Sequence, residues 1–245
     1  MAAPISSSKR ARPTTRPRTA GPRSAIAVGR RIFLRKPTAH DRKEYVALRR
    51  RSASLLARWE PRPPRSRVAR QFTVWLASGR DERHEKLLIC RIEDGCILGA
   101  INLNEIVRGP AQSAYLGYWI GAPYAKQGYM TEALQLALSH AFRDLGLHRV
   151  EANIMPANRA SLALVRRAGF RREGYSPRYL KIAGRWTDHE RWALLVEDWH
   201  PAPSASRSQG HGLESKRGDE RKSFMRECLK REKTVSATGS NVGSA

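Results

Sequence analysis

The chain has 245 residues, a hydrophobic content of 40% and a formal net charge of +24 at pH 7. This length and content suit one globular core, and no run approaches eighteen consecutive apolar residues, so we expect no membrane span. The excess of positive charge is not confined to the two ends of the chain. It favours an anionic partner, such as RNA, the ribosome or the phosphates of a cofactor.

Composition divides the chain into three parts. Residues 1–25 are rich in Ser, Pro and Arg and predict a disordered basic tail. An Arg- and Ser-rich start without acids also resembles an organelle transit peptide, although its prolines prevent a clean amphipathic helix. Residues 26–200 predict one domain. Residues 201–245 are polar and predict a second disordered basic tail, with a marginal helix at 215–233.

Hydrophobic periodicity and turn residues predict the elements of the domain in chain order. Its first half contains a strand at 31–35, helices at 41–52 and 67–78 joined by a proline-rich segment at 59–65, and a hairpin of strands at 86–93 and 96–107. Its second half contains a strand at 113–120, a long helix, a strand at 148–155, a helix at 158–167, and strands at 172–182 and 185–196. This order indicates an α+β, or mixed α/β, fold with helices packed on one sheet.

The stretch 115–145 carries the clearest local signal. Apolar residues from Met130 to Leu145 follow at spacings of three and one, which predicts an amphipathic helix ended by Gly146. The preceding residues 125–130 gather main-chain N–H groups at the helix start, where unpaired donors and the helix dipole favour phosphate. Gly128 would let the backbone approach a ligand closely. An ordinary loop into a core helix is also compatible with one glycine.

Cysteine and histidine usage narrows the chemistry. Three cysteines, an odd number, do not suggest a disulfide framework, so we expect reduced thiols and a cytoplasmic protein. The seven histidines are scattered and no metal-ligand spacing occurs, so we expect no metal.

Several short segments stand in one order between Arg31 and Trp199: WEP, YLGYWIG, YMTEAL, HRVEANIMPANRAS, AGFRREGY and YLKIAGRWTDHERWALLVEDW. They resemble the GNAT acetyltransferases and, within them, the RimJ/RimL family of ribosomal-protein N-terminal acetyltransferases, most closely its alanine-acetylating branch. The resemblance implies a GNAT-type acyl-CoA N-acyltransferase fold, acetyl-CoA as co-substrate and the N-terminal alanine of a ribosomal protein as acceptor.

The resemblance also implies roles for individual residues. The CoA diphosphate would bind the loop of form [RQ]-x-x-G-x-[GA], here Ala125, Lys126, Gln127, Gly128, Tyr129 and Met130, which keeps the first glycine but departs at both ends. The strands at 115–120 and 148–155 would part to admit the CoA arm. Main-chain N–H groups near Tyr118, Trp119 and Ile120 would then polarise the thioester carbonyl.

Two polar residues at the next helix start have both a structural and a functional interpretation. Asn158 is a suitable helix N-cap, and by resemblance it contacts the CoA arm. Ser161 is an ordinary third helical residue, and by resemblance it donates a proton or hydrogen bond to the leaving thiolate. Many GNAT enzymes use a tyrosine for that task, at a position that is Val165 here.

The general base is not evident from the sequence. RimL-like members carry a glutamate where this chain has Tyr115, and Glu105, Asp188 and His189 are further candidates, Glu105 and Asp188 as substrate contacts. Each is also an ordinary surface or structural residue. An α-amine of pKa about 7.8 is roughly one-seventh neutral at pH 7, against about 0.04% for lysine, so a missing carboxylate favours an N-terminal amine.

Two other functions stay open at this level. The acceptor could be a small amine such as a polyamine or an aminoglycoside, although a basic protein should repel polycations. The chain could also be a ribosome- or RNA-binding assembly factor with vestigial transferase activity.

Overall fold

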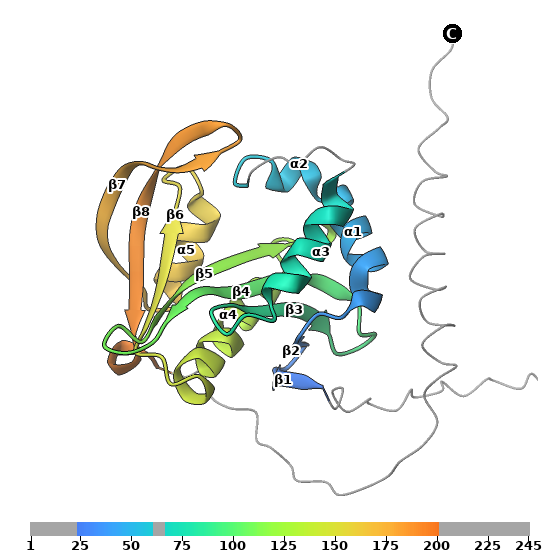
Figure 1. Cartoon of the computed structure of the whole chain (residues 1–245), viewed down its shortest axis with the longest axis horizontal. Helices are drawn as coiled ribbons and strands as arrows, with labels where there is room; N and C mark the ends of the chain where they lie inside the picture. The colour runs from blue at the N-terminus through green and yellow to red at the C-terminus, as the bar shows by residue number, and fades with distance from the viewer. Residues whose placement is uncertain (1–23, 61–66, 201–245) are drawn as a thin grey trace, which may run out of the picture.

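The structure, a computed structural model, describes residues 24–60 and 67–200 (Figure 1). The predicted tails, except residues 24 and 25, and residues 61–66 of the proline-rich segment lie outside this range. The first elements are β1 (Ala25–Val28), β2 (Ile32–Arg35), η1 (Ala39–Asp41), α1 (Arg42–Arg51), α2 (Ala53–Leu56), α3 (Val68–Ser78), β3 (Glu85–Arg91) and β4 (Ile97–Val107). They are followed by β5 (Ser113–Ile120), η3 (Ala122–Tyr124), α4 (Tyr129–Ser139), η4 (His140–Asp144), β6 (Arg149–Ile154), α5 (Arg159–Arg167), β7 (Arg171–Ile182), β8 (Arg185–Leu195) and η5 (Val196–Asp198).

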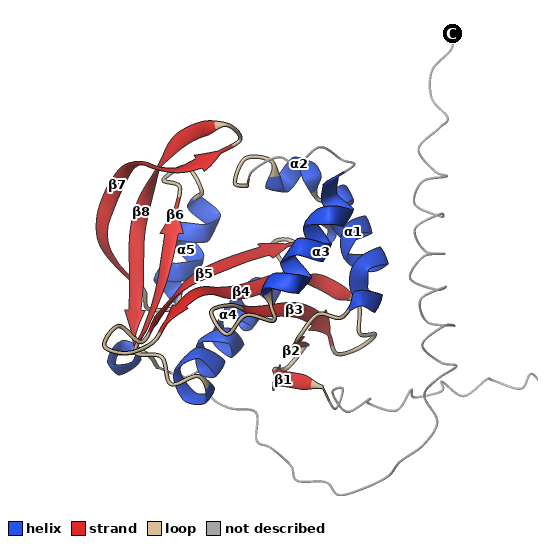
Figure 2. Cartoon of the chain, in the orientation of Figure 1, coloured by secondary structure: helices blue, strands red, loops and turns tan. Residues whose placement is uncertain are grey.

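Eight strands form one mixed sheet in the order β1-β2-β3-β4-β5-β6-β8-β7, with helices on its faces (Figure 2). Every neighbouring pair is antiparallel except β5 and β6. A parallel pair requires a crossover connection, and α4 supplies it here. The predicted α+β class with a mixed sheet flanked by helices is confirmed.

Apolar side chains at alternating strand positions bury one cluster on each face of the sheet. On one face, α4 and α5 pack over residues such as Ala114, Leu116 and Val150. On the other face, α1 and α3 cover Trp119, and the Tyr45 ring lies 5.3 Å from the Trp119 ring. This second cluster takes no residue from β6, β7 or β8, so that half of the sheet has no helix over it in the described ranges.

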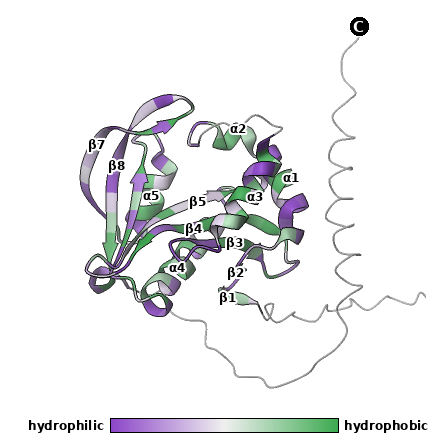
Figure 3. Cartoon of the chain, viewed as in Figure 1, coloured by the Kyte–Doolittle hydropathy of each residue, from purple (hydrophilic) through white to green (hydrophobic). Residues whose placement is uncertain are grey.

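Hydropathy follows this arrangement. In Figure 3 the hydrophobic positions concentrate on the central strands and the inner sides of the helices, whereas the outer strand β7 is mostly hydrophilic. Cys90 and Cys96 are buried and form no disulfide. No helix within residues 24–60 and 67–200 is long and apolar enough to cross a membrane.

Candidate active site

The loop before α4 has the conformation that its glycine predicts. Gly128 is the N-cap of α4 and has φ 81° and ψ −3°, in the left-handed region. Lys126 is also left-handed, with φ 61°. The first recorded donor of the helix is the Glu132 N–H, which bonds the Gly128 carbonyl at 3.2 Å. The N–H groups of residues 126 to 131 donate to no acceptor among the described residues, and the loop is exposed from 126 to 128. These amides are therefore available to an anionic ligand.

Arg31, in the turn between β1 and β2, binds this loop. Its Nη1 donates to the Gln127 carbonyl at 3.0 Å, and its Nε donates to Glu132 Oε2 at 3.1 Å. The guanidinium also lies 4.6 Å from the centre of the Tyr129 ring. A Cβ at Gly128 would lie 3.2 Å from Arg31 Nη2, so a positive charge stands directly beside the free amides. Sequence reasoning missed Arg31, because about a hundred residues separate it from its partners.

A buried serine anchors the turn between β5 and the loop. Ser52 Oγ donates to the Leu48 carbonyl at 2.7 Å and accepts from the Ala122 N–H at 2.9 Å. A Cβ at Gly121 would overlap the buried Leu48 side chain, so a larger residue here would displace Leu48. α1 therefore fixes where the loop begins. The sequence offered no local sign of this contact.

β5 and β6 separate after a short parallel segment, as predicted. Their pairing covers residues 113 to 115 of β5 and 149 to 151 of β6, and ends with Tyr115 opposite Glu151. The Gly121 N–H bonds the Leu98 carbonyl, so alternation turns the N–H groups of Tyr118 and Ile120 away from β4. Within the described part of the chain no strand pairs with β5 there. These two donors, and not the Trp119 N–H, therefore face the opening.

Tyr118 and Ser161 form a hydrogen bond across this opening, between β5 and α5. Burial raises the pKa of Tyr118 to about 12, against a smaller lowering by Ser161, so the phenol holds its proton. The Ser161 N–H donates to Asn158 Oδ1 at 3.2 Å, which confirms Asn158 as the helix N-cap. Val165 is fully buried. The sequence had predicted a role only for the main chain of Tyr118, and its side chain adds a second hydroxyl beside Ser161.

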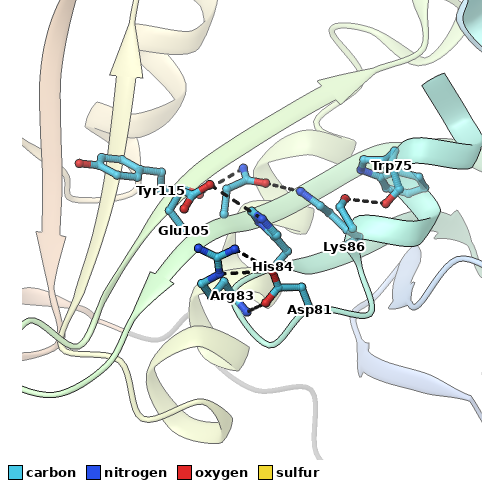
Figure 4. A network of polar contacts seen from close by, with 9 residues as sticks. Trp75, Asp81, Arg83, His84, Lys86, Glu105 and Tyr115 are labelled. Carbon is cyan, nitrogen blue, oxygen red and sulfur yellow. Dashed lines mark hydrogen bonds and ion pairs between the residues drawn. The ribbon is translucent and has the colours of Figure 1, made fainter.

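Tyr115 lies at the fork between the strands, on the face opposite α4 and α5. Figure 4 shows it beside Glu105, at one end of a polar network that passes His84 and Lys86. Asn104 Nδ2 donates to the Tyr115 carbonyl at 3.4 Å, and Lys86 Nζ bonds Asn104 Oδ1. Burial raises the pKa of Tyr115, and the negative charge of Glu151 and the Tyr179 hydroxyl raise it further. Tyr115 is therefore a protonated hydroxyl near pH 7 rather than a base.

The other candidate bases have structural partners. Glu105 is exposed at a bulge of β4, with φ 48°, and its Oε1 lies 3.8 Å from His84 Nε2. Asp188 accepts from the Tyr175 hydroxyl at 2.6 Å and from the Arg178 N–H at 2.7 Å, and these bonds lower its pKa. His189 is buried, with Nδ1 3.0 Å from the Thr187 carbonyl. Their roles toward a substrate stay predictions. No three His, Cys, Asp or Glu side chains gather into a metal-binding group in the described ranges.

The parted strands, the free amides of the loop and the crossover helix together define a class of protein. The family model described as an acetyltransferase (GNAT) domain matches residues 31–171, more than half of the chain, and the chain belongs to this family. A second model, the psiF repeat, matches residues 213–230, which lie outside the described ranges.

Particular relatives narrow the comparison. The chain is 44% identical over 105 residues to the [Ribosomal protein uS5]-alanine N-acetyltransferase of Escherichia coli, a stretch of 43% of this chain and 54% of that protein. It is 40% identical over 105 residues to a Bacillus subtilis protein named Probable N-acetyltransferase YjcK, a stretch of 43% of this chain and 58% of that protein. The matches thus span little more than half the length of these curated relatives.

A solved structure extends the comparison. Mycobacterium smegmatis RimJ in complex with CoA-disulfide superposes with a TM-score of 0.64 at 30% identity, over 68% of this chain and 82% of that chain. The predicted GNAT fold and the resemblance to the RimJ/RimL family are confirmed.

Proposed function

We propose that the protein transfers the acetyl group of acetyl-CoA to the N-terminal α-amine of a ribosomal protein. The observation that carries the donor half of this proposal is the row of unspent main-chain amides from residue 126 to residue 131. Six adjacent donors at a helix start, with Gly128 left-handed and Arg31 beside them, fit a diphosphate. Because backbone groups make this cradle, the departures at Ala125 and Met130 leave it intact.

The gap between β5 and β6 fits the rest of the donor. A pantetheine arm carries amides that can pair with exposed strand edges, as an added strand would. When bound, acetyl-CoA supplies the acetyl group as an activated thioester. The N–H groups of Tyr118 and Ile120 lie about 7 Å apart along the strand edge. One of them donates to the thioester carbonyl oxygen as negative charge develops there, and the other is available to a carbonyl group of the arm.

The Tyr118–Ser161 pair stabilises the leaving thiolate. Two contacts hold Ser161: its main-chain N–H donates to Asn158 Oδ1, and its Oγ forms a hydrogen bond with the Tyr118 hydroxyl. A hydroxyl fixed in this way donates a hydrogen bond to the departing thiolate, and Tyr118, with its raised pKa, is a proton-holding partner behind it. The α-amine loses its proton to water, since a substantial fraction of it is neutral near pH 7.

The acceptor is proposed to be an N-terminal alanine. The support is the E. coli relative, whose name gives alanine N-acetyltransferase activity on ribosomal protein uS5, together with the similarity to the RimJ structure. The test is incubation of the chain with isotope-labelled acetyl-CoA and purified ribosomal proteins, followed by mass spectrometry of their N-termini. An Ala-starting peptide, the same peptide with a blocked N-terminus and an internal lysine, and spermidine serve as parallel acceptors. Label on the free α-amine is expected. Label confined to lysine or spermidine would refute the proposal.

A further inference from the structure

A carboxylate that the sequence did not single out lies where the two strands part. Glu151 on β6 is the register partner of Tyr115, the last residue of β5 that pairs with β6. Its neighbours Val150 and Ala152 point into the cluster under α4 and α5, so Glu151 points to the opposite face. That face has no helix over β6 in the described part of the chain, and the Glu151 side chain is partly exposed there.

The ion pairs around Glu151 leave part of its carboxylate unused. Arg149 Nε donates to Glu151 Oε1 at 3.0 Å, and the two remaining nitrogens of Arg149 bind Glu173. Glu173 also feels the charge of Arg191. Glu151 Oε2 has no donor within residues 24–60 and 67–200, although the side chain is only 22% exposed. Of the two carboxylates that share Arg149, Glu151 is therefore the one with capacity for another cation.

We propose that Glu151 binds the N-terminal ammonium of the acceptor and places it at the fork, which rests on the proposed function above. The hydroxyl of Tyr115 interacts with that of Tyr179, so both tyrosines lie at the fork beside Glu151. A strand rises about 3.3 Å per residue, so Tyr118 lies about 10 Å along β5 from Tyr115. The ammonium is therefore held at the mouth of the gap, and the amine moves along the gap to the thioester once it leaves Glu151.

This role explains how a strongly basic protein recruits a cationic group. The net charge of +24 repels an ammonium ion at long range, so a local carboxylate is needed to hold it. Binding the ammonium form does not by itself move a proton. The amine loses its proton to water at the fork and then attacks, so Glu151 takes no part in the proton transfer.

The test compares Glu151→Gln with Glu173→Gln. Both changes remove one carboxylate from Arg149, but only the first removes the group at the fork, so Glu173→Gln is a matched control for the ion pair. In steady-state assays with an Ala-starting peptide, we expect Glu151→Gln to raise KM about tenfold, as loss of one charge-assisted hydrogen bond does, and to change kcat less than about threefold. Glu173→Gln should match the wild type.

Product inhibition separates ammonium binding from a general distortion of the site. The N-acetylated peptide carries no ammonium, so its inhibition constant should be the same for Glu151→Gln and the wild type. Acetyl-CoA affinity by calorimetry should also be unchanged. Equal kinetics for the two variants, or a parallel loss of affinity for the acetylated peptide, would overturn the inference and leave the proposed function standing. Absence of α-amine transfer by the wild-type chain would overturn both.

Thermal unfolding of each variant shows whether it is folded at the assay temperature. If Glu151→Gln unfolds below the assay temperature, Glu151→Asp replaces it, because it retains the charge but shortens the reach. A KM for Glu151→Asp equal to that of the wild type would count against placement of the ammonium by this side chain, and a raised KM with an unchanged inhibition constant for the acetylated peptide would support it.

Discussion

Substitution of Gly128 by aspartate should abolish tight binding of acetyl-CoA. Two effects combine at this position. Gly128 has φ 81°, and a non-glycine residue pays about 1–2 kcal/mol there, although aspartate tolerates the left-handed region better than most residues. The new carboxylate would also stand beside the free amides, where the diphosphate is proposed to bind.

The electrostatic effect is the larger of the two. A carboxylate about 5 Å from two phosphate charges costs about 1.7 kcal/mol even at the dielectric constant of water, which corresponds to roughly fifteenfold in affinity. A lower effective dielectric constant at the loop increases this value severalfold, so fifteenfold is the minimum expected. Arg31, whose Nη2 would lie 3.2 Å from the new Cβ, would pair with the carboxylate and no longer be available to the ligand.

The assay is isothermal calorimetry with acetyl-CoA, and Gly109→Asp is the control. Gly109 is also left-handed, with φ 65°, and a Cβ there meets nothing within 4 Å. Both variants therefore add the same charge and the same kind of backbone strain, but only one of them does so at the loop. Unchanged affinity in Gly128→Asp, or an equal loss in Gly109→Asp, would refute assignment of these amides to the diphosphate.

Three further predictions test the stability of the domain and the roles of single side chains. Arg35 binds the buried Asp41 through two hydrogen bonds of 2.8 and 2.7 Å, so Asp41→Asn should cost about 3 kcal/mol in urea unfolding. Burial alone would raise the pKa of Asp41, but Arg35 holds this pKa below its ordinary value. The stabilisation by the pair is therefore present above about pH 4 and is lost as the pH falls through the pKa of the folded state. A difference in unfolding free energy between wild type and variant that stayed constant down to about pH 2 would contradict this. Ser161→Ala should lower kcat about tenfold or more with little change in KM, and Tyr118→Phe should lower it less; the reverse order would make the tyrosine the donor. Arg31→Gln should weaken acetyl-CoA binding about fivefold at low salt, and the difference should shrink as salt is added, since an effect independent of salt would point to loop packing alone.

Elements with strong local signals were predictable from the sequence. The strand at 113–120 coincides with β5, and Gly146 ends the long helix with φ 62°. The turn at Ala183 and Gly184 has φ 49° and 85°, as a tight hairpin turn requires. The strand β1 was missed because four residues pair with β2 through a turn that carries no strong hairpin signature. The last turn of the long helix, residues 140–144, is a π-helix, which an apolar stripe does not distinguish from an α-helix.

The site was predictable only where one short stretch builds it. Gly128 and its neighbouring amides come from consecutive residues, and the Asn158 cap bonds a residue three positions along. Arg31, in the turn between β1 and β2, and Glu151, on β6, reach the site from distant parts of the sequence, and nothing in their local sequence marks them. Register decides the second case, because Tyr115 meets Glu151 only through the pairing of β5 with β6. The resemblance places these two strands side by side, but a single sequence contains no signal for their register.

The net charge of the chain is a poor guide to where ligands bind, because it does not tell which cations already have a carboxylate partner. Arg35, Arg49, Arg91 and Arg149 each bind a carboxylate, at side-chain exposures between 13% and 27%. Such cations stabilise strands and loops and contribute little to an external anion. Arg31 differs, since its guanidinium is half exposed and stands beside amides that have no acceptor among the described residues. A cation of this kind, next to unpaired donors, attracts phosphate in a way that the total of +24 does not measure.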